Sequence, residues 1–124
     1  MTINHLNFTV TNVDAAARFF ETYFEFRRLD KKPNDSLSIL DNADGFLLVL
    51  MSEKMNENGN TGYPDVFHAG FMLDSMQQVI DLHNNLKAGG ITLDQEPQRM
   101  RKSFGFYFNI DKIMIEVGTF NLDA

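Results

Sequence analysis

One order of predicted elements occurs twice in this chain, once on each side of a polar segment rich in Gly and Asn at residues 53–64. Each half reads as a strand, a helix and then three strands. The halves also align by residue at their beginnings, because His5 falls on His68 and Phe8 falls on Phe71 at one constant offset. An internal duplication indicates two copies of one small unit. Since each copy alone is too small to bury a core, we expect the copies to pack together.

The length of the chain, 124 residues and 14.2 kDa, is that of one ordinary domain. Hydrophobic residues make up 44% and charged residues 23%, which is typical of a globular protein and not of a disordered tail or a fibre. We therefore predict a single α+β domain over residues 1–124, built from two tandem β-α-β-β-β modules. Module one is placed at residues 1–52, the linker at 53–64 and module two at 65–120.

The periodicity of apolar residues supplies the individual elements. Strands are predicted at residues 3–10, 37–40, 46–51, 66–73, 91–93, 104–108 and 113–117, and helices at residues 13–25 and 76–86. Asn12 is the expected N-cap of the first helix. Ser75 and Gln78 form a capping box for the second helix, and Gly89 with Gly90 indicates its end.

Composition and charge exclude several classes of function. The formal net charge is −6, so nucleic acid is not an expected partner. The chain has no cysteine, which excludes a disulfide framework, a thiolate metal site and a cysteine nucleophile. The longest purely apolar run, residues 46–51, is too short to cross a bilayer, and the N-terminal residues lack the pattern of a signal peptide. We expect a cytoplasmic protein with no membrane partner.

The strand faces opposite the apolar rows carry the residues of chemical interest. Two imidazoles and a carboxylate stand there, namely His5, His68 and Glu116. Nitrogen and oxygen donors of this kind bind divalent metals where no sulfur is available, and three such ligands leave positions open for water, oxygen or substrate. The lesser polar residues on the same faces are Asn7, Thr9, Tyr107 and Asn109.

Each of these residues also has a simpler interpretation. A single histidine at the start of a strand is more often a hydrogen-bonded rim residue than a ligand, and Glu116 alone could face solvent. The matching places of the two histidines in the duplicated unit favour a shared role. His83, on the second helix, is interpreted as solvated and without a role. The cluster of Arg99, Arg101 and Lys102 reads first as a solvated loop and alternatively as an anchor for an anionic substrate.

Three segments resemble the vicinal oxygen chelate superfamily, which includes glyoxalase I, bleomycin-resistance proteins, fosfomycin-resistance enzymes and extradiol dioxygenases. NHLNFTV at residues 4–10 is similar to the opening strand of that superfamily, and VDAAARFFETYF at residues 13–24 is similar to its first helix. FNIDKIMIE at residues 108–116 resembles its closing segment. The resemblance implies that the two modules form a curved mixed sheet around a cavity, usually in a homodimer.

The same resemblance assigns roles to individual residues. It implies a divalent metal ion (Fe, Mn, Ni or Zn) held by His5, His68 and Glu116, with Glu116 also as the catalytic carboxylate. The fourth ligand position of the family falls on Val49, which cannot ligate or accept a proton, so ordinary glyoxalase I activity is not expected. Apart from the resemblance, the candidate substrate-binding residues are Asn7, Thr9 and Tyr107 of the polar strand faces and Arg101 of the basic cluster.

Two functional hypotheses follow from these residues. The first is a metal-dependent enzyme of lyase, dioxygenase or transferase type that acts on a small oxygen-chelating substrate. The second is a metal-independent protein that binds or sequesters an antibiotic-type small molecule in an apolar cavity. A degenerate member with a collapsed cavity is a third possibility, and the retained histidines and glutamate place the metalloenzyme ahead.

Overall fold

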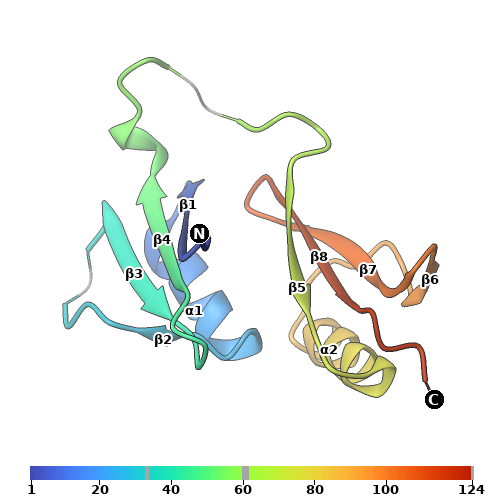
Figure 1. Ribbon diagram of the computed structural model, residues 1–124. Helices are drawn as coiled ribbons and strands as arrows, with labels where there is room; N and C mark the ends of the chain where they lie inside the picture. The colour runs from blue at the N-terminus through green and yellow to red at the C-terminus, as the bar shows by residue number, and fades with distance from the viewer. Residues whose placement is uncertain (33, 60–61, 124) are drawn as a thin grey trace. The chain divides into compact units, whose positions relative to one another are not determined.

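The structure, a computed structural model, describes residues 1–32, 34–59 and 62–123. It divides into two compact units, Met1–Gly62 and Tyr63–Ala124 (Figure 1). Each unit contains a mixed four-stranded sheet and an α-helix that packs against it. Neither helix in the described ranges is long and apolar enough to cross a membrane.

In the first unit, α1 covers one face of a sheet whose strand order is β1-β4-β3-β2. β1 runs parallel to β4, and the other neighbours are antiparallel. The elements are β1 (His5–Val10), α1 (Val13–Tyr23), β2 (Arg27–Arg28), β3 (Leu37–Asp41), β4 (Leu47–Ser52) and the 3-10 turn η1 (Glu53–Met55).

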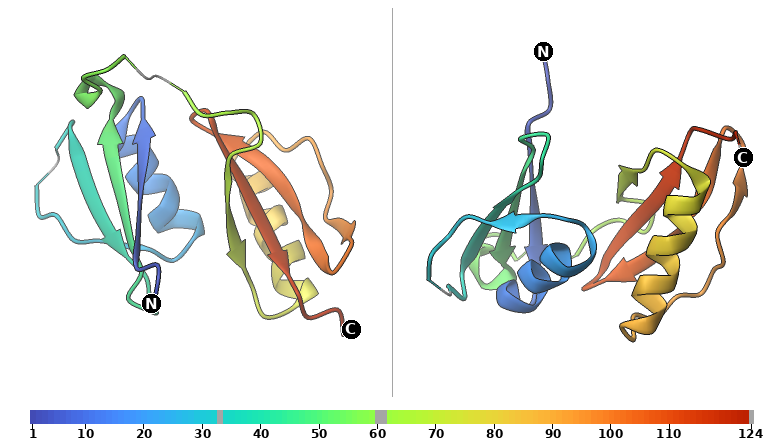
Figure 2. Two further views of the ribbon diagram at one scale, coloured as in Figure 1. Left: turned by 45° about the horizontal axis from the view of Figure 1, so that its top comes forward. Right: turned by 90° about the horizontal axis from the view of Figure 1, so that it is seen from below.

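The second unit repeats this topology with the strand order β5-β8-β7-β6, and α2 packs on β7 and β8 (Figure 2). β5 is parallel to β8, as β1 is to β4. The elements are β5 (His68–Met72), α2 (Met76–Ala88), β6 (Gln98–Met100), β7 (Ser103–Ile110) and β8 (Ile113–Thr119). The predicted β-α-β-β-β repeat and the α+β class are therefore confirmed.

Both helices begin at the predicted caps. The Asn12 side chain accepts a hydrogen bond from the backbone N–H of Ala15 at 2.9 Å. Ser75 and Gln78 form the full capping box, because the side chain of each accepts a hydrogen bond from the backbone N–H of the other. The helix α2 ends at Gly89, whose N–H donates to the carbonyl of Asn85.

Phenylalanine side chains form much of the core between each sheet and its helix. Phe20 on α1 is 1% exposed and packs against the rings of Phe8, Phe19, Phe24 and Phe26. Edge-to-face and offset ring pairs of this kind add stability beyond the area that they bury. The helix-facing residues of β7 and β8 are likewise buried, namely Phe106, Phe108, Ile113, Ile115 and Val117.

The prediction of a strand at residues 91–93 is wrong. That segment is irregular, and the third strand of the second module is β6, which lay in a predicted loop. β6 forms because Met100 and Ser103 pair across a two-residue turn. Its residues carry no apolar alternation and are mostly exposed, so periodicity could not reveal it. The short strand β2 was missed for the same reason.

His83 is also corrected, because it is 2% exposed and not solvated. Its Nε2 lies 2.8 Å from the carbonyl oxygen of Gln95, and its ring meets Phe106 edge to face with centroids 4.9 Å apart. Its polar neighbours along the helix suggested exposure, but the side chain lies on the buried stripe with Val79 and Leu86. His83 therefore ties the segment after α2 to the core.

A charged cluster fixes α1 to the sheet of the first unit. Arg28 Nη1 donates to Asp14 Oδ1 at 2.7 Å, and Nε lies 3.0 Å from both Asp30 Oδ2 and Ser38 Oγ. The hydrogen bond from Arg28 lowers the pKa of Asp14. For Asp30, burial alone would raise the pKa, but the hydrogen bonds from Ser38, the Ile39 backbone and Arg28 together lower it.

Replacing Arg28 by Met should lower the midpoint of thermal unfolding by several degrees at pH 7. Both lowered carboxyl pKa values mean that the folded state prefers the ionised acids. This stabilisation is present above the ordinary aspartate pKa of 3.8 and is lost as the pH falls through the lowered values. The difference in unfolding midpoint between the wild type and Arg28→Met, measured by circular dichroism, should therefore disappear between about pH 5 and pH 2.

Arg18→Met is the control, since Arg18 also pairs with Asp14 but its side chain is 70% exposed. Exposed pairs contribute little, so its midpoint should stay close to that of the wild type. A gap for Arg28→Met that is constant with pH would contradict the assigned role of the two carboxylates.

Gly105 permits the close approach of β7 and β8. A Cβ atom built at this position would lie 2.1 Å from the carbonyl oxygen of Val117 and 2.7 Å from the Cα of Gly118. Both obstacles are backbone atoms, so no side-chain rotation relieves the clash. The strand pair that carries Tyr107 and Glu116 thus requires glycine here.

Gly105→Ala should therefore cost at least about 2 kcal/mol of unfolding free energy, the range expected for steric strain in a core. Gly62→Ala is the matched control, because a Cβ there meets nothing within 4 Å, and it should change stability by less than about 0.5 kcal/mol. The unfolding free energies of both variants are measured by urea denaturation. If Gly105→Ala were as stable as Gly62→Ala, β7 and β8 would be able to move apart at Gly105 without a loss of stability.

Candidate functional site

Strand register places three predicted functional residues of the second unit on one face of the sheet, opposite α2. Glu116 on the central strand β8 pairs with Tyr107 of β7 on one side and with Gly70 of β5 on the other. His68 begins β5 and alternates with Ala69, so it shares the face of Gly70. The imidazole, the phenol and the carboxylate are therefore neighbours.

The imidazole of His68 approaches the carboxylate directly, with Nε2 3.4 Å from Glu116 Oε1. The other ring nitrogen, Nδ1, lies 2.9 Å from the carbonyl oxygen of Val66, which can only accept a hydrogen bond. A turn holds this carbonyl in place, because the N–H of Phe67 donates to the carbonyl of Pro64 and the rings of Tyr63 and Phe67 stack. Nδ1 therefore donates to that carbonyl, and Nε2 is the ring nitrogen directed at Glu116.

An imidazole nitrogen that faces a carboxylate oxygen at this distance either donates a proton to it or binds a cation together with it. Ligands about 2.1 Å from one divalent ion at a roughly tetrahedral angle lie about 3.4 Å from each other. The observed separation of 3.4 Å equals that value. The pair is thus suited to share a metal ion.

Tyr107 supports the carboxylate. Its ring meets that of His68 edge to face, with centroids 5.4 Å apart. Burial raises the pKa of Tyr107, and the negative charge of Glu116 and a hydrogen bond to Glu116 raise it further. The phenol consequently stays protonated beside Glu116 and is not a base.

Gly70 is the neighbour of Glu116 on β5. A Cβ atom at position 70 would lie 3.4 Å from Glu116 Oε1 and 3.4 Å from the methyl carbon of Met72. These are ordinary van der Waals contacts, so a methyl group at position 70 would fit against the carboxylate. Sequence reasoning overlooked this glycine, although its position between His68 and Met72 in an alternating strand is a recognisable signal.

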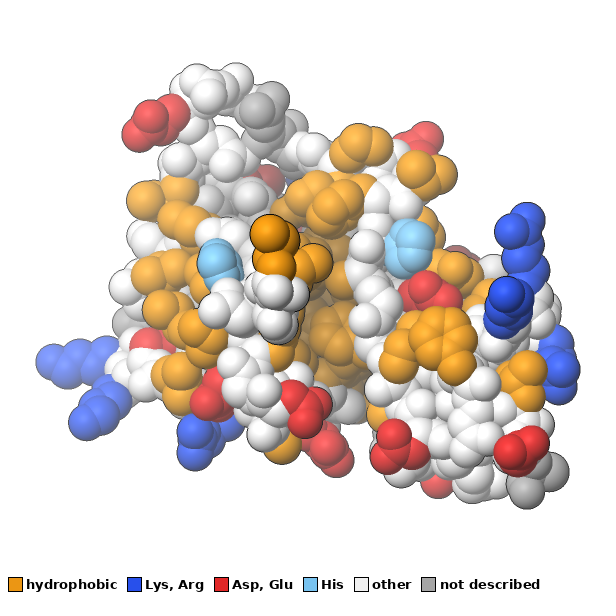
Figure 3. Space-filling model, in the orientation of Figure 1, with side chains coloured by type: hydrophobic (Ala, Val, Ile, Leu, Met, Phe, Trp, Pro, Cys, Tyr) orange, Lys and Arg blue, Asp and Glu red, His pale blue; other side chains and the backbone are white. Residues whose placement is uncertain are grey.

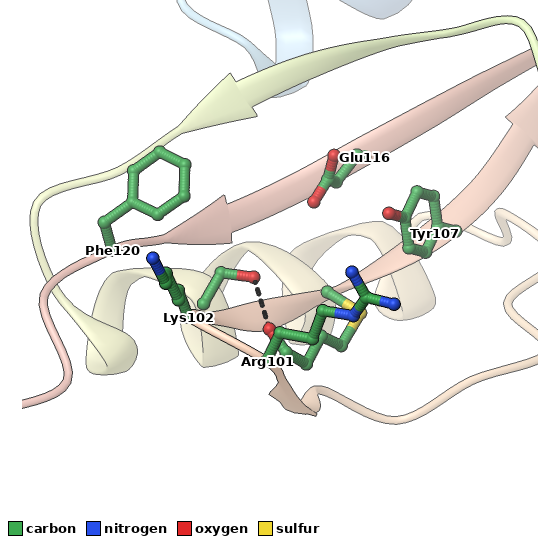
Figure 4. A pocket seen from close by; sticks show the side chains of 7 residues that line it. Arg101, Lys102, Tyr107, Glu116 and Phe120 are labelled. Atoms are coloured by element: carbon green, nitrogen blue, oxygen red, sulfur yellow. Dashed lines mark hydrogen bonds between the residues drawn. The ribbon is translucent and has the colours of Figure 1, made fainter.

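An open cavity of about 510 Å³ adjoins the carboxylate and lies wholly within the second unit. Its lining residues are Met100, Arg101, Lys102, Ser103, Tyr107, Glu116 and Phe120 (Figure 4). Tyr107, Glu116 and Arg101 had been predicted as site residues. The remaining lining comes mostly from the β6–β7 turn, which could not be located without the register of β6. In Figure 3, the half that contains β5–β8 shows a histidine beside an acidic side chain, with Lys and Arg side chains at its outer edge.

The first unit carries the other predicted residues on the sheet face opposite α1. His5 Nδ1 lies 2.8 Å from Asn4 Oδ1, which leaves Nε2 as the outward nitrogen. Asn7 pairs with Val49 and its Nδ2 donates to Met51 Sδ, while Thr9 pairs with Met51 in the register of β1 and β4. The rest of this face is apolar and half-buried, formed by Leu37, Ile39, Leu47, Val49 and Met51.

The structure thus brings His68, Glu116, Tyr107 and Arg101 to one region of the second unit. His5, Asn7 and Thr9 share a face of the first unit. Across residues 1–32, 34–59 and 62–123, no three histidine or acidic side chains are grouped so that they could hold a metal ion. The geometry therefore supplies a two-donor pair in the second unit, and the third ligand stays a prediction.

Comparison with known proteins gives a family and a set of related structures. Residues 2–117 match the model of the Glyoxalase/Bleomycin resistance protein/Dioxygenase superfamily. A possible glyoxalase from Bacillus cereus is 33% identical, with a TM-score of 0.77 over 94% of this chain and 97% of that chain. Lactoylglutathione lyase from Agrobacterium tumefaciens is 20% identical, with a TM-score of 0.74 over 95% of this chain and 92% of that chain. No curated protein matches.

A glyoxylase/bleomycin resistance protein/dioxygenase domain from Frankia sp. EAN1pec is 19% identical, with a TM-score of 0.79 over 100% of this chain and 95% of that chain. The two relatives at or below 20% identity support the fold alone. The family model, in contrast, spans nearly the whole sequence, including both histidine strands and the closing strand with Glu116. The chain belongs to the Glyoxalase/Bleomycin resistance protein/Dioxygenase superfamily.

Proposed function

We propose that this protein is a divalent-metal-dependent enzyme of lyase, dioxygenase or transferase type, acting on a small substrate that chelates the metal through neighbouring oxygens. The observation that carries the proposal is the His68–Glu116 pair, in which Nε2 and Oε1 lie 3.4 Å apart while Nδ1 is engaged by the Val66 carbonyl. Members of the superfamily usually bind a divalent metal ion. The proposed ligands are His68, Glu116 and, from the first unit, His5.

The chemistry of these donors fits Fe, Mn, Ni or Zn, all of which accept imidazole and carboxylate ligands. Both histidines engage Nδ1 in a hydrogen bond and present Nε2, the usual arrangement of a metal-binding imidazole. When bound, such an ion polarises the substrate oxygens and stabilises the negative charge that develops on them.

The residues of the chain orient these groups. Tyr107 lies beside Glu116, our proposed catalytic group, and its ring also contacts that of His68. Val49 provides no second carboxylate, so proton transfer between two such groups is not part of the proposal. The proposed substrate contacts are Asn7, Thr9, Tyr107 and Arg101. We further propose that the two units form a single domain and that the chain forms a homodimer.

The proposal predicts one divalent ion per chain, measured by titration calorimetry with Zn²⁺ and Mn²⁺ after chelator treatment. His68→Gln and Glu116→Gln should each weaken binding at least about 100-fold, because loss of a direct ligand costs more than the 10–100-fold typical of its hydrogen-bond partners. His5→Gln tests the third ligand separately.

Glu21→Gln, an exposed position on α1, removes the same charge without touching the pair and should bind as the wild type does. Stoichiometry below about a tenth of an equivalent for the wild-type chain would refute the metal site. Wild-type affinity in both His68→Gln and Glu116→Gln would show that any bound metal uses other donors.

The apolar sheet face of the first unit favours a second candidate function. Val49 occupies the position where a further polar ligand would stand, and Leu47 and Met51 flank it on the same face of β4. Such a face suits an apolar small molecule held without a metal, as expected of a binding or sequestering protein.

This alternative predicts that the chelator-treated chain raises the fluorescence of 8-anilinonaphthalene-1-sulfonate, and that Val49→Asp reduces the effect several-fold. Val66→Asp is the control, since Val66 is 79% exposed in the other unit. An equal response from both variants would place the dye elsewhere.

A further inference from the structure

We infer that the cavity of the second unit holds the anionic group of its ligand, a carboxylate, phosphate or phosphonate, at the β6–β7 turn between Arg101 and Lys102. The inference deepens the proposed function and rests on it for the role of Glu116 at the ligand's other end. For Arg101 and Lys102, a role in binding an anion is thus favoured over the interpretation as a solvated loop.

The turn projects both basic side chains at the rim of the cavity. Met100 and Ser103 pair across it, so Arg101 and Lys102 are the two turn residues. The Ser103 hydroxyl donates to the Met100 carbonyl at 3.1 Å and closes the turn. Figure 4 shows Lys102 next to Phe120, and Arg101 reaching from the turn in the direction of Tyr107 and Glu116.

Charge in the cavity is opposite to that of the whole chain. Arg101 and Lys102 outnumber Glu116 among the lining residues, whereas the chain carries a formal net charge of −6. Within the described residues, neither basic side chain has a hydrogen bond or salt bridge to an acidic group. Two cations without protein partners at a concave, partly apolar site are suited to bind an anion.

The remaining lining indicates what accompanies the anionic group. Phe120 borders the cavity and is 69% exposed, and Met100, which also lines the cavity, is half-buried. Exposed apolar side chains of this size gain from contact with an apolar ligand body. The expected ligand is a small amphipathic anion, with its charge at the turn, its apolar part against Phe120 and its other polar end near Glu116.

The backbone conformation at Arg101 allows a substitution that removes the charge without disturbing the turn. Its φ of +49° lies in the left-handed region, where Arg is disfavoured and Asn is accommodated. Arg101→Asn should therefore preserve or improve folding while it removes the guanidinium. A structural role for Arg101 would predict loss of stability instead.

The test is a titration of the ¹⁵N-labelled full chain, treated with chelator, with inorganic phosphate and then phenylphosphonate, followed by NMR. We expect saturable shifts at the amides of residues 100–103, and tighter binding of phenylphosphonate than of phosphate because of the apolar wall. Arg101→Asn/Lys102→Gln should weaken both at least tenfold. Arg99→Gln/Lys87→Gln removes the same charge outside the cavity and should leave both affinities unchanged.

Glu116→Gln separates this inference from the proposed metal site. It should abolish metal binding yet strengthen phosphate binding, since it removes a negative charge from the cavity. Saturable phosphate binding without any metal binding would leave the anion site standing and the metal proposal refuted. Linear, non-saturating shifts, or equal losses in the cavity and control double variants, would overturn the anion site whatever the metal result.

Discussion

The pairing of β8 with β5 on one side and β7 on the other determines where the functional side chains of the second unit lie. It sets Glu116 between Gly70 and Tyr107, whose phenol stays protonated beside the carboxylate. The same register brings His68 within 3.4 Å of the carboxylate. A slip of one residue would turn Glu116 toward α2, among the phenyl rings of the core. Gly105, which lets β7 approach β8, is thus as necessary to the site as its polar residues.

Much of the fold could be predicted because the decisive signals are local. The alternation in β1 and β5 and the caps at Asn12 and Ser75 each lie within a few neighbouring residues. β6 escaped prediction because its formation depends on a partner strand and a turn, not on its own hydropathy. His83 was misjudged because its polar neighbours concealed which side of α2 it occupies.

The candidate site, like the fold, could be predicted from the sequence only in part. Residue type and strand alternation sufficed to place His68, Glu116 and Tyr107 on one face. They could not show the carbonyl of Val66 that fixes the tautomer of His68, since this contact depends on the turn that precedes β5. Nor could they show that Lys102 and Phe120 border the same cavity as Glu116, because β6, β7 and the end of β8 meet there only after folding.

The two units present the same register with different contents. Where Glu116 faces the bare backbone of Gly70, Val49 faces the amide side chain of Asn7. An acidic residue at position 49 would meet that amide, one of whose N–H groups already donates to Met51. Since a carboxamide has two N–H groups, the other one is able to donate to a carboxylate at position 49, so a single substitution there would give this face an acidic group with a neutral donor beside it.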